Sequence, residues 1–320
     1  MRLAWALGMA LLVTLLGAVL GGSQAWTEAW AAAFTGPWAA SWASLQAVFP
    51  MPVLPWLAAL WVLLAVAWGR HRPWWQQALV VLALGLVAVA SFQIAWGFHA
   101  GRPSGLERYG LTAKGTPTEA DQVAARLAAQ LRSGRSEPFD LPGALVASGE
   151  RLEGMTGVTR LPPETVTVPG WLFGPLDLAG VVSPWTYEVH VNGGLPAWAQ
   201  AAVVAHERAH LAGFASEQDA EWVGAVAGLT SGHPDAAYAA ALWMWIKAPA
   251  DLRAQYDPGP TARADIEALR EALARYDAFD ARWAWRIYDA WLRSRGDTLG
   301  TAGYAAGFDA LVRAHAGGWW

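Results

Sequence analysis

The sequence predicts an α-helical membrane anchor of two or three spans, followed by a mostly helical α+β domain on the outer side of the membrane. Two observations support this prediction. Of the 320 residues, 55% are hydrophobic and only 15% are charged, whereas about 25% of residues are charged in typical soluble domains. The apolar excess is concentrated before residue 98, and the remainder contains all but three of the 22 basic residues and all but one of the 26 acidic ones.

Three charge-free apolar runs lie near the N-terminus, at residues 3–20, 53–69 and 78–97. Each is about long enough to cross ~30 Å of hydrocarbon, and none has the polar face of a buried helix in a soluble protein. The first run could instead be a signal peptide, because Arg2 precedes it and Ser23-Gln24-Ala25 resembles a cleavage site. We therefore expect the membrane anchor to occupy residues 1–97.

The basic residues of the short loops predict the orientation. Arg70 and Arg72 lie between the second and third runs, whereas residues 23–50 contain no Lys or Arg. The positive-inside rule then assigns Arg70 and Arg72 to the cytoplasm. Everything after residue 97 is expected on the outer side, with the lipid bilayer as a partner.

Five aromatic residues recur every four positions between the first two runs: Trp26, Trp30, Phe34, Trp38 and Trp42. On one helix they would form a single aromatic stripe. Such a stripe suits the headgroup zone of the membrane or packing against the spans, and the spacing does not choose between the two. Gly36-Pro37 would interrupt a single helix here.

Residues 98–117 contain Gly, Pro and Ser and are interpreted as a linker, so the working domain is expected over residues 118–320. Apolar spacing predicts helices at 118–133, 196–212, 216–230, 235–247, 261–294 and 301–314. Alternation and β-branched residues predict strands at 164–172 and 187–191. Thr118 is the expected cap of the first of these helices, and Gly213 ends the second.

The helix at 196–212 contains His206-Glu207-Arg208-Ala209-His210. Two imidazoles four residues apart lie on one helical face and can bind one zinc ion. The composition alone gives roughly 0.006 such patterns in a chain of this length, so chance explains the motif poorly. We predict His206 and His210 as Zn²⁺ ligands and Glu207 as the catalytic base that takes a proton from metal-activated water.

A catalytic zinc site needs a third protein ligand. After Gly213, Ser216 can cap a new helix that carries Glu217 in its first turn and Glu221 one turn later. We predict Glu217 as the third ligand and Glu221 as the acceptor of a hydrogen bond from a ligand imidazole. Glu221 has two alternative roles, as the ligand in place of Glu217 or as an ordinary exposed charge.

The chain resembles a bacterial family, domain of unknown function 3810, whose members are membrane-anchored and carry a zincin-like motif. The resemblance rests on HExxH followed by Gly-Phe-Ala-Ser-Glu, and on three further elements in order: Pro184-Trp185-Thr186 to Asn192, Tyr276-Asp277, and Gly300 to Tyr304. It covers most of residues 1–315. It implies a zincin-like metalloprotease domain in the inner membrane of a bacterium.

Two other groups share part of the motif. The Glu-x-x-Ala-acidic pattern is similar to that of the integral-membrane prenyl-protein proteases, whose first Glu binds zinc. Those enzymes usually have Asp at the position of Glu221. The short gap after His210 looks more like that of the Gly-turn zincins, which have His where this chain has Ser216.

Further residues are candidates for contact with the substrate or the oxyanion. Zincins usually run an edge strand beside the active helix, and by resemblance Trp185–Val191 is the expected strand. Glu188 and His190 share one face of it, and either could face the cleft or be a structurally bonded residue. Tyr187, His233 and Tyr238 are unranked candidates for the oxyanion donor, with packing as the alternative role of each Tyr.

The motif and the resemblance together predict zinc-dependent hydrolysis of a protein or peptide substrate. The alternative is a non-catalytic scaffold or binding protein stabilised by zinc, which would not need Glu207. An intramembrane protease is disfavoured by the charges of Arg208 and Glu217 around the motif. The net charge of −4 disfavours nucleic acid as a partner, and the absence of Cys excludes thiol chemistry. The oligomeric state is not indicated.

Overall fold

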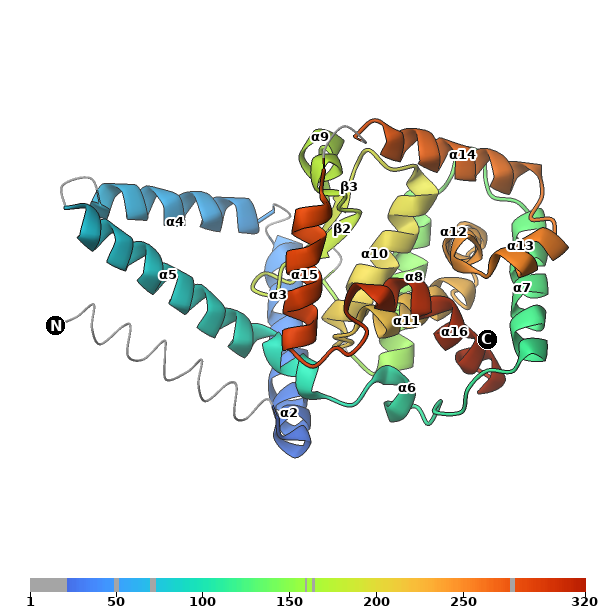
Figure 1. The fold of residues 1–320 in the computed structure, drawn as a ribbon, viewed down its shortest axis with the longest axis horizontal. Helices are drawn as coiled ribbons and strands as arrows, with labels where there is room; N and C mark the ends of the chain where they lie inside the picture. Colours follow the sequence, from blue (N-terminus) through green and yellow to red (C-terminus); the bar gives the residue numbers. More distant parts are fainter. Residues whose placement is uncertain (1–21, 49–51, 70–72, 159, 163–164, 277–279) are drawn as a thin grey trace.

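Two apolar helices project from a helical body in this computed structural model (Figure 1). The structure describes residues 22–48, 52–69, 73–158, 160–162, 165–276 and 280–320. The predicted span at 3–20 lies outside the described residues, as do Arg70 and Arg72, on which the predicted orientation depends.

The projecting helices are α4 (Leu54–Gly69) and α5 (Trp74–Ala95), and both lack charged residues. Within the described chain, α5 is the one helix that is long and apolar enough to cross a membrane. Only 22% of its most apolar window is buried, so α5 is not the core helix of a soluble domain. The predicted runs 53–69 and 78–97 fall on these two helices, although α4 has only 16 residues.

The aromatic stripe lies on one continuous helical segment, which runs through α2 (Gln24–Trp30), the π-helical turn η1 (Ala31–Thr35) and α3 (Gly36–Val48). The expected interruption at Gly36-Pro37 is wrong, because α3 begins there and the π-helical turn precedes it. The rings pack on the body. Trp26 lies 4.2 Å from Phe98 between ring centroids, and Trp38 and Trp42 contact the core. This segment therefore belongs with the body, although the sequence assigned it to the anchor.

The stretch interpreted as a linker is folded onto the body. It contains η2 (Gly97–Gly101) and α6 (Gly105–Arg108), and His99, Leu106 and Leu111 are buried. The Gly105 N–H donates to Asp219 Oδ2 at 2.8 Å. Residues 98–117 thus brace the start of a site-bearing helix and do not form a free connection.

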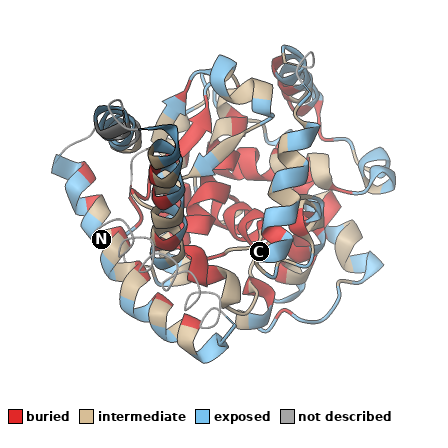
Figure 2. Ribbon diagram, turned by 60° about the vertical axis from the view of Figure 1, so that its left-hand side comes forward, coloured by how far each residue is buried: buried red, intermediate tan, exposed pale blue. Residues whose placement is uncertain are grey.

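The body is built around six helices, and its buried residues gather at their centre (Figure 2). They are α7 (Pro117–Arg132), α8 (Leu141–Thr156), α10 (Ala197–Leu211), α11 (Glu217–Leu229), α12 (Pro234–Lys247) and α16 (Gly303–Ala316). Helices α10 and α11 pack on each other, and α8, α12 and α16 surround them. The cap of α7 is Thr116 and not Thr118, because Thr116 forms a capping box with Glu119.

A small sheet lies beside α10, with strands β1 (Thr165–Val168), β2 (Gly180–Val182) and β3 (Val189–Asn192) in the order β1-β3-β2. β1 pairs with β3 in parallel, and β2 pairs with β3 antiparallel with Val181 opposite His190. The expectation that Trp185–Val191 forms the edge strand is wrong, because β3 is paired on both sides. β2 is the edge strand next to α10. The short helices α9 (Gly170–Phe173) and η3 (Gly174–Leu176) connect β1 to β2.

The long helix predicted at 261–294 is two helices, α14 (Pro260–Ala274) and α15 (Arg282–Ser294). Asp280 Oδ1 accepts the N–H of Arg282 at 3.0 Å, which starts a new helix in the manner of a cap. The elements that were not predicted include α8, β2 and the short α13 (Ala250–Gln255). The 3-10 turn η4 (Gly300–Ala302) precedes α16, which confirms the last predicted helix near 301–314.

Candidate metal centre

The turn between α10 and α11 brings the motif and the following acidic segment together. Gly213 ends α10 with a positive φ of 90°, a conformation that favours glycine. Ser216 caps α11, because its side chain accepts the Asp219 N–H at 3.1 Å. Both were predicted from the sequence. A Cβ at Gly224 would lie 2.9 Å from the backbone of Ala205, so this glycine allows α11 to approach α10 beside the motif.

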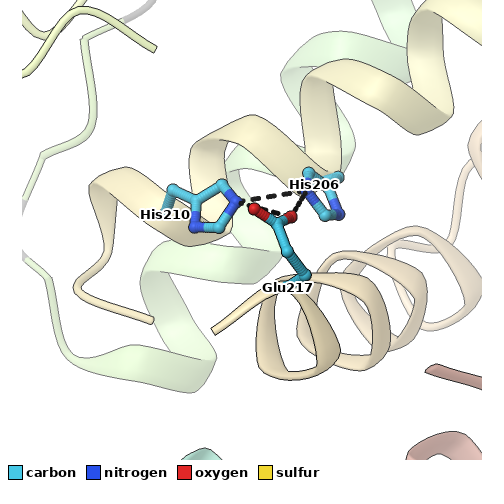
Figure 3. A group of neighbouring side chains, drawn as sticks. All are labelled: His206, His210 and Glu217. Carbon is cyan, nitrogen blue, oxygen red and sulfur yellow. Dashed lines mark hydrogen bonds and ion pairs between the residues drawn. The ribbon is translucent and has the colours of Figure 1, made fainter. Parts of the chain in front are cut away.

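Three side chains converge between these helices (Figure 3). His206 and His210 extend from one face of α10, and Glu217 reaches them from the first turn of α11. Glu217 Oε2 lies 3.2 Å from His206 Nε2 and 3.4 Å from His210 Nε2, and the two Nε2 atoms are 3.2 Å apart. All three residues are buried.

The geometry of this triad fits a metal ion. A tetrahedral ion with ligand distances of ~2.0–2.2 Å needs ligand atoms about 3.3 Å apart, which agrees with the three separations between these atoms. His210 Nδ1 lies 2.7 Å from Phe214 O. Donation of Nδ1–H to this carbonyl leaves the Nε2 lone pair directed at the centre. His206, His210 and Glu217 could therefore hold a metal ion.

The same three groups are electrostatically coupled. Burial alone would lower the pKa of His210, but the neighbouring Glu217 carboxylate raises it to about 9. Burial would raise the pKa of Glu217, but the two imidazoles hold it well below its usual range. Without a metal ion the cluster therefore keeps a proton on an imidazole beside an ionised carboxylate. A cation can take the place of that proton.

Glu207 lies in the wall of a cavity next to the triad. A Cβ at Gly180 on β2 would come within 3.0 Å of Glu207 Oε1, so this glycine leaves room for the carboxylate. Burial raises the pKa of Glu207, although the two nearby imidazoles oppose the shift. A carboxylate with a raised pKa is a stronger base than an exposed one.

Glu221 lies behind the first imidazole. Its Oε1 is 3.6 Å from His206 Nδ1, and Lys247 and the Trp243 indole N–H both donate to its carboxylate. The carboxylate oxygen that lies close to both Nε2 atoms belongs to Glu217. The geometry therefore favours Glu217 over Glu221 as the ligand, and Glu221 lies where it can orient His206.

Two tyrosines complete the centre, and the sequence did not predict either. Tyr288 on α15 donates to Glu217 Oε1 at 2.5 Å. The ring of Tyr304 on α16 stacks on His206, with 5.7 Å between centroids, and burial followed by the Glu217 charge raises the pKa of Tyr304. Trp285, Tyr288 and Leu292 are spaced to lie on one helical face, and all three line the cavity. This spacing could have indicated that Tyr288 faces the site. Tyr304 lies in the Gly300–Tyr304 element.

The five other predicted residues do not line the cavity. Tyr187 is fully buried. His233 pairs with Asp140 at 3.2 Å, and the Tyr238 hydroxyl donates to Asp265 at 2.7 Å. The structure therefore does not bring these three residues to the metal centre.

Glu188 and His190 do not line the cavity either. Glu188 accepts the backbone N–H groups of Val53 and Leu54, the latter at 3.1 Å. His190 Nε2 lies 3.5 Å from Glu188 Oε2. Glu188 thus has the structurally bonded position that the sequence left open, and it ties the start of α4 to the sheet. His190 is buried beside it, and its Nε2 has no hydrogen-bond partner among the described residues.

The cavity beside the triad has a volume of about 570 Å³. Besides the triad, Glu207 and Glu221, apolar and aromatic side chains form most of its wall. They come from the end of α5, from β2, and from α12, α14 and α15. Such a mostly apolar cavity with a few converging polar groups is typical of a binding site.

Comparisons with known proteins give one result. Residues 38–312 match the family described as protein of unknown function (DUF3810). No curated protein and no solved structure matches the chain. The match extends from α3 to α16 and includes the whole metal centre. The chain therefore belongs to the DUF3810 family.

Proposed function

We propose that this protein is a membrane-associated, zinc-dependent peptidase with a zincin-like centre. One observation carries the proposal: three ligand atoms converge within 3.2–3.4 Å of one another beside a glutamate that is not a ligand. Structural zinc sites are closed by four protein ligands, whereas catalytic sites have three and keep one position open. The cavity next to the triad supplies that open side.

The donor set and its tetrahedral spacing are compatible with zinc. Two imidazoles and one carboxylate, with no thiolate, form a known set for catalytic zinc. When bound, zinc polarises a peptide carbonyl and lowers the pKa of water. The groups behind the ligands also support the proposal. Phe214 O and Tyr288 lie within hydrogen-bond distance of His210 and Glu217, and Glu221 lies 3.6 Å from His206 Nδ1.

The residues of the chain have distinct roles in this proposal. Glu207 accepts a proton from the attacking water and returns it to the leaving amine. Tyr304 lies over His206 with its hydroxyl proton retained by a raised pKa, so it can donate to the developing oxyanion. Tyr288 fixes the Glu217 carboxylate through its hydrogen bond.

The edge strand supports a polypeptide as the substrate. Gly180, Val181 and Val182 of β2 line the cavity, and only one side of β2 pairs with β3. An extended peptide can add to the other side through main-chain hydrogen bonds. It would then run past Glu207, which lies against Gly180.

The location completes the proposal. α5 is long and apolar enough to span a membrane, and the loop arginines Arg70 and Arg72 favour a cytoplasmic loop between α4 and α5. The catalytic body then lies on the outer face of the bacterial inner membrane.

The test uses the full-length protein in detergent, with zinc content and cleavage of a mixed peptide library as measurements. We expect about one zinc per chain and hydrolysis by the wild type. Glu207→Gln keeps the shape of the side chain and should retain zinc, but hydrolysis should fall by the 10²–10⁴-fold typical of a lost general base.

His206→Ala is the matched variant, because it should lose both zinc and hydrolysis. Equal rates for wild type and Glu207→Gln would contradict the proposed base. A wild type that binds zinc but cleaves no peptide of the library would favour the scaffold alternative.

A further inference from the structure

The wall of the metal cavity includes the end of the candidate membrane helix. Phe92 in the last turn of α5 and Trp96 just after it both line the cavity. The Trp96 indole N–H donates to the carbonyl of His210 at 3.2 Å. The residue that follows α5 therefore contacts a residue of the metal centre directly.

Helix α15 crosses the end of α5 (Figure 1) and closes the same side of the cavity. Trp291 packs edge-on against Phe92 with 5.7 Å between ring centroids. The guanidinium of Arg295 lies 5.3 Å from the Phe92 ring centroid and donates to the Gly97 carbonyl. These contacts fix α15 at the level of the α5 terminus.

The outer face of α15 is amphipathic and uncovered, with exposed apolar residues beside three exposed arginines of the same helix. Trp283 and Ile287 are 60% and 63% exposed, while Tyr288 and Leu292 line the cavity. The nearby helix α9 also exposes Trp171, at 70%. Figure 1 shows both helices on the side of the body from which α4 and α5 project, opposite α7. Large apolar residues gathered on one face indicate an interaction surface.

We propose that this face lies on the bilayer that holds α5, and that the site acts on polypeptides anchored in the same membrane. The cleavage in this proposal rests on the proposed function. The occupant is lipid because α15 meets the end of α5 through the Trp291–Phe92 contact. The exposed apolar residues of α5 in the described part of the chain face lipid when α5 spans the membrane. Tryptophan on an amphipathic helix is typical of the membrane interface.

The substrate class follows from the position of the cavity. With α15 on the bilayer, the cavity opens at the membrane surface, and Phe92, Trp96 and Trp291 offer contacts to apolar side chains. A substrate anchored in the same bilayer presents its scissile bond at a constant height above the lipid. This tethering raises its effective concentration, with an expected gain on the order of 10² over a free peptide.

The first experiment measures lipid contact without using metal or activity. Because the chain has no Cys, Ile287→Cys gives a single site for a fluorescent label in the full-length protein. Gln122→Cys on α7 is the control, because it is exposed on the opposite side of the body. Both are reconstituted in phosphatidylcholine vesicles that contain lipids with a nitroxide near the headgroup.

We expect the lipid nitroxide to quench the label at 287 and aqueous iodide to spare it, with the reverse result at 122. Equal quenching of both labels by iodide would overturn the proposal. Protection from both quenchers at 287 would also overturn it, because that result indicates a protein partner, such as a second copy.

The second experiment measures the substrate class. One sequence that the wild type cleaves is presented as a free peptide and, at equal total concentration, fused to a single transmembrane helix in the same vesicles. We expect faster cleavage of the anchored form by about 10². The double variant Trp283→Gln, Ile287→Gln should remove most of this preference and leave cleavage of the free peptide unchanged.

The outcomes separate the two proposals. Equal cleavage of the free and anchored forms by the wild type would overturn the substrate class and leave the peptidase intact. If neither form of any library sequence were cleaved, the proposed function would fail and the substrate class with it, whereas the lipid contact would still be decided by the labels.

Discussion

Helices α10 and α5 have opposite relations between composition and burial. All but two of the 15 residues of α10 are buried, including the three ionisable residues of its HExxH motif and Arg208. α5 has no charged residue, and yet most of its length is uncovered. In a soluble domain, a helix as apolar as α5 would be buried, and ionisable residues such as those of α10 would be exposed.

This difference between the two helices indicates which surroundings stabilise each of them. Burial of a charged group costs several kcal/mol unless it is paired, and α10 has its compensation in Glu217 and, behind Arg208, in the carbonyl of Leu145. Burial lowers the pKa of Arg208 to about 10, although the Glu153 charge opposes the shift. α5 instead needs an apolar environment around it. In the proposed function a cation meets this need for α10, and lipid meets it for α5.

The largest expected effect comes from breaking the compensation at α10. Glu217→Ala removes one of three ligands and leaves two buried imidazoles without their carboxylate. Loss of a partner behind a ligand costs 10–100-fold in metal affinity, so loss of the ligand itself should cost more than about 100-fold. Competition with a chelator measures the affinity. Glu267→Ala on α14 is the control, since that carboxylate is exposed.

If Glu217→Ala retained wild-type affinity, the third ligand would have to be another residue. Glu221→Ala then decides the assignment. It should lose less zinc than Glu217→Ala, because Glu221 contacts only the far nitrogen of His206.

The triad could be predicted from the sequence because its residues are local. His206, His210 and Glu217 lie within one helix, one glycine turn and the first turn of the next helix. Spacing alone puts the two imidazoles on one face. The cap of α11 then fixes where Glu217 points.

The tyrosines could not be predicted because tertiary packing brings them to the site. Tyr288 and Tyr304 approach Glu217 and His206 from helices far along the chain. α15 is apolar on its inner face and on part of its outer face, so its pattern did not reveal which side faced the site. Trp26 was misassigned for a similar reason, since its partner Phe98 lay in the supposed linker.

The pH dependence of zinc affinity tests the electrostatic coupling between His210 on α10 and Glu217. In the metal-free protein His210 has a pKa raised to about 9, because Glu217 outweighs the effect of burial. Below pH 9 zinc must therefore displace one proton from His210, and above it the imidazole is already free. We expect zinc affinity to rise about tenfold per pH unit from ~7 to 9 and then to level off. A flat profile in chelator competition would contradict this coupling.

A separate link joins the body to the projecting helices: the Glu188 carboxylate accepts two N–H groups at the start of α4. Glu188→Ala leaves these donors without their acceptor, so the free energy of unfolding should fall by about 1–3 kcal/mol. Denaturant unfolding in detergent measures it. Zinc content should stay at the wild-type level, because Glu188 lies outside the cavity.

Glu188→Gln is the matched variant. Its amide oxygen can still accept one of the two N–H groups, so it should lose less stability than Glu188→Ala. Loss of zinc in either variant would show that the start of α4 and the metal centre depend on each other.

The smallest effect on stability and activity is expected at Tyr238. This residue belongs to a buried polar network that lies outside the metal centre. Its hydroxyl donates to Asp265 at 2.7 Å, and Arg135 holds the same carboxylate. Tyr238→Phe removes one hydrogen bond and should cost about 0.5–1.5 kcal/mol of stability, while zinc content and kcat/KM stay unchanged. Tyr304→Phe gives the contrast: it should lower kcat by up to about 10²–10³ without loss of zinc, if its hydroxyl stabilises the oxyanion. Equal effects of the two variants on kcat would remove the distinction between a packed and a catalytic tyrosine.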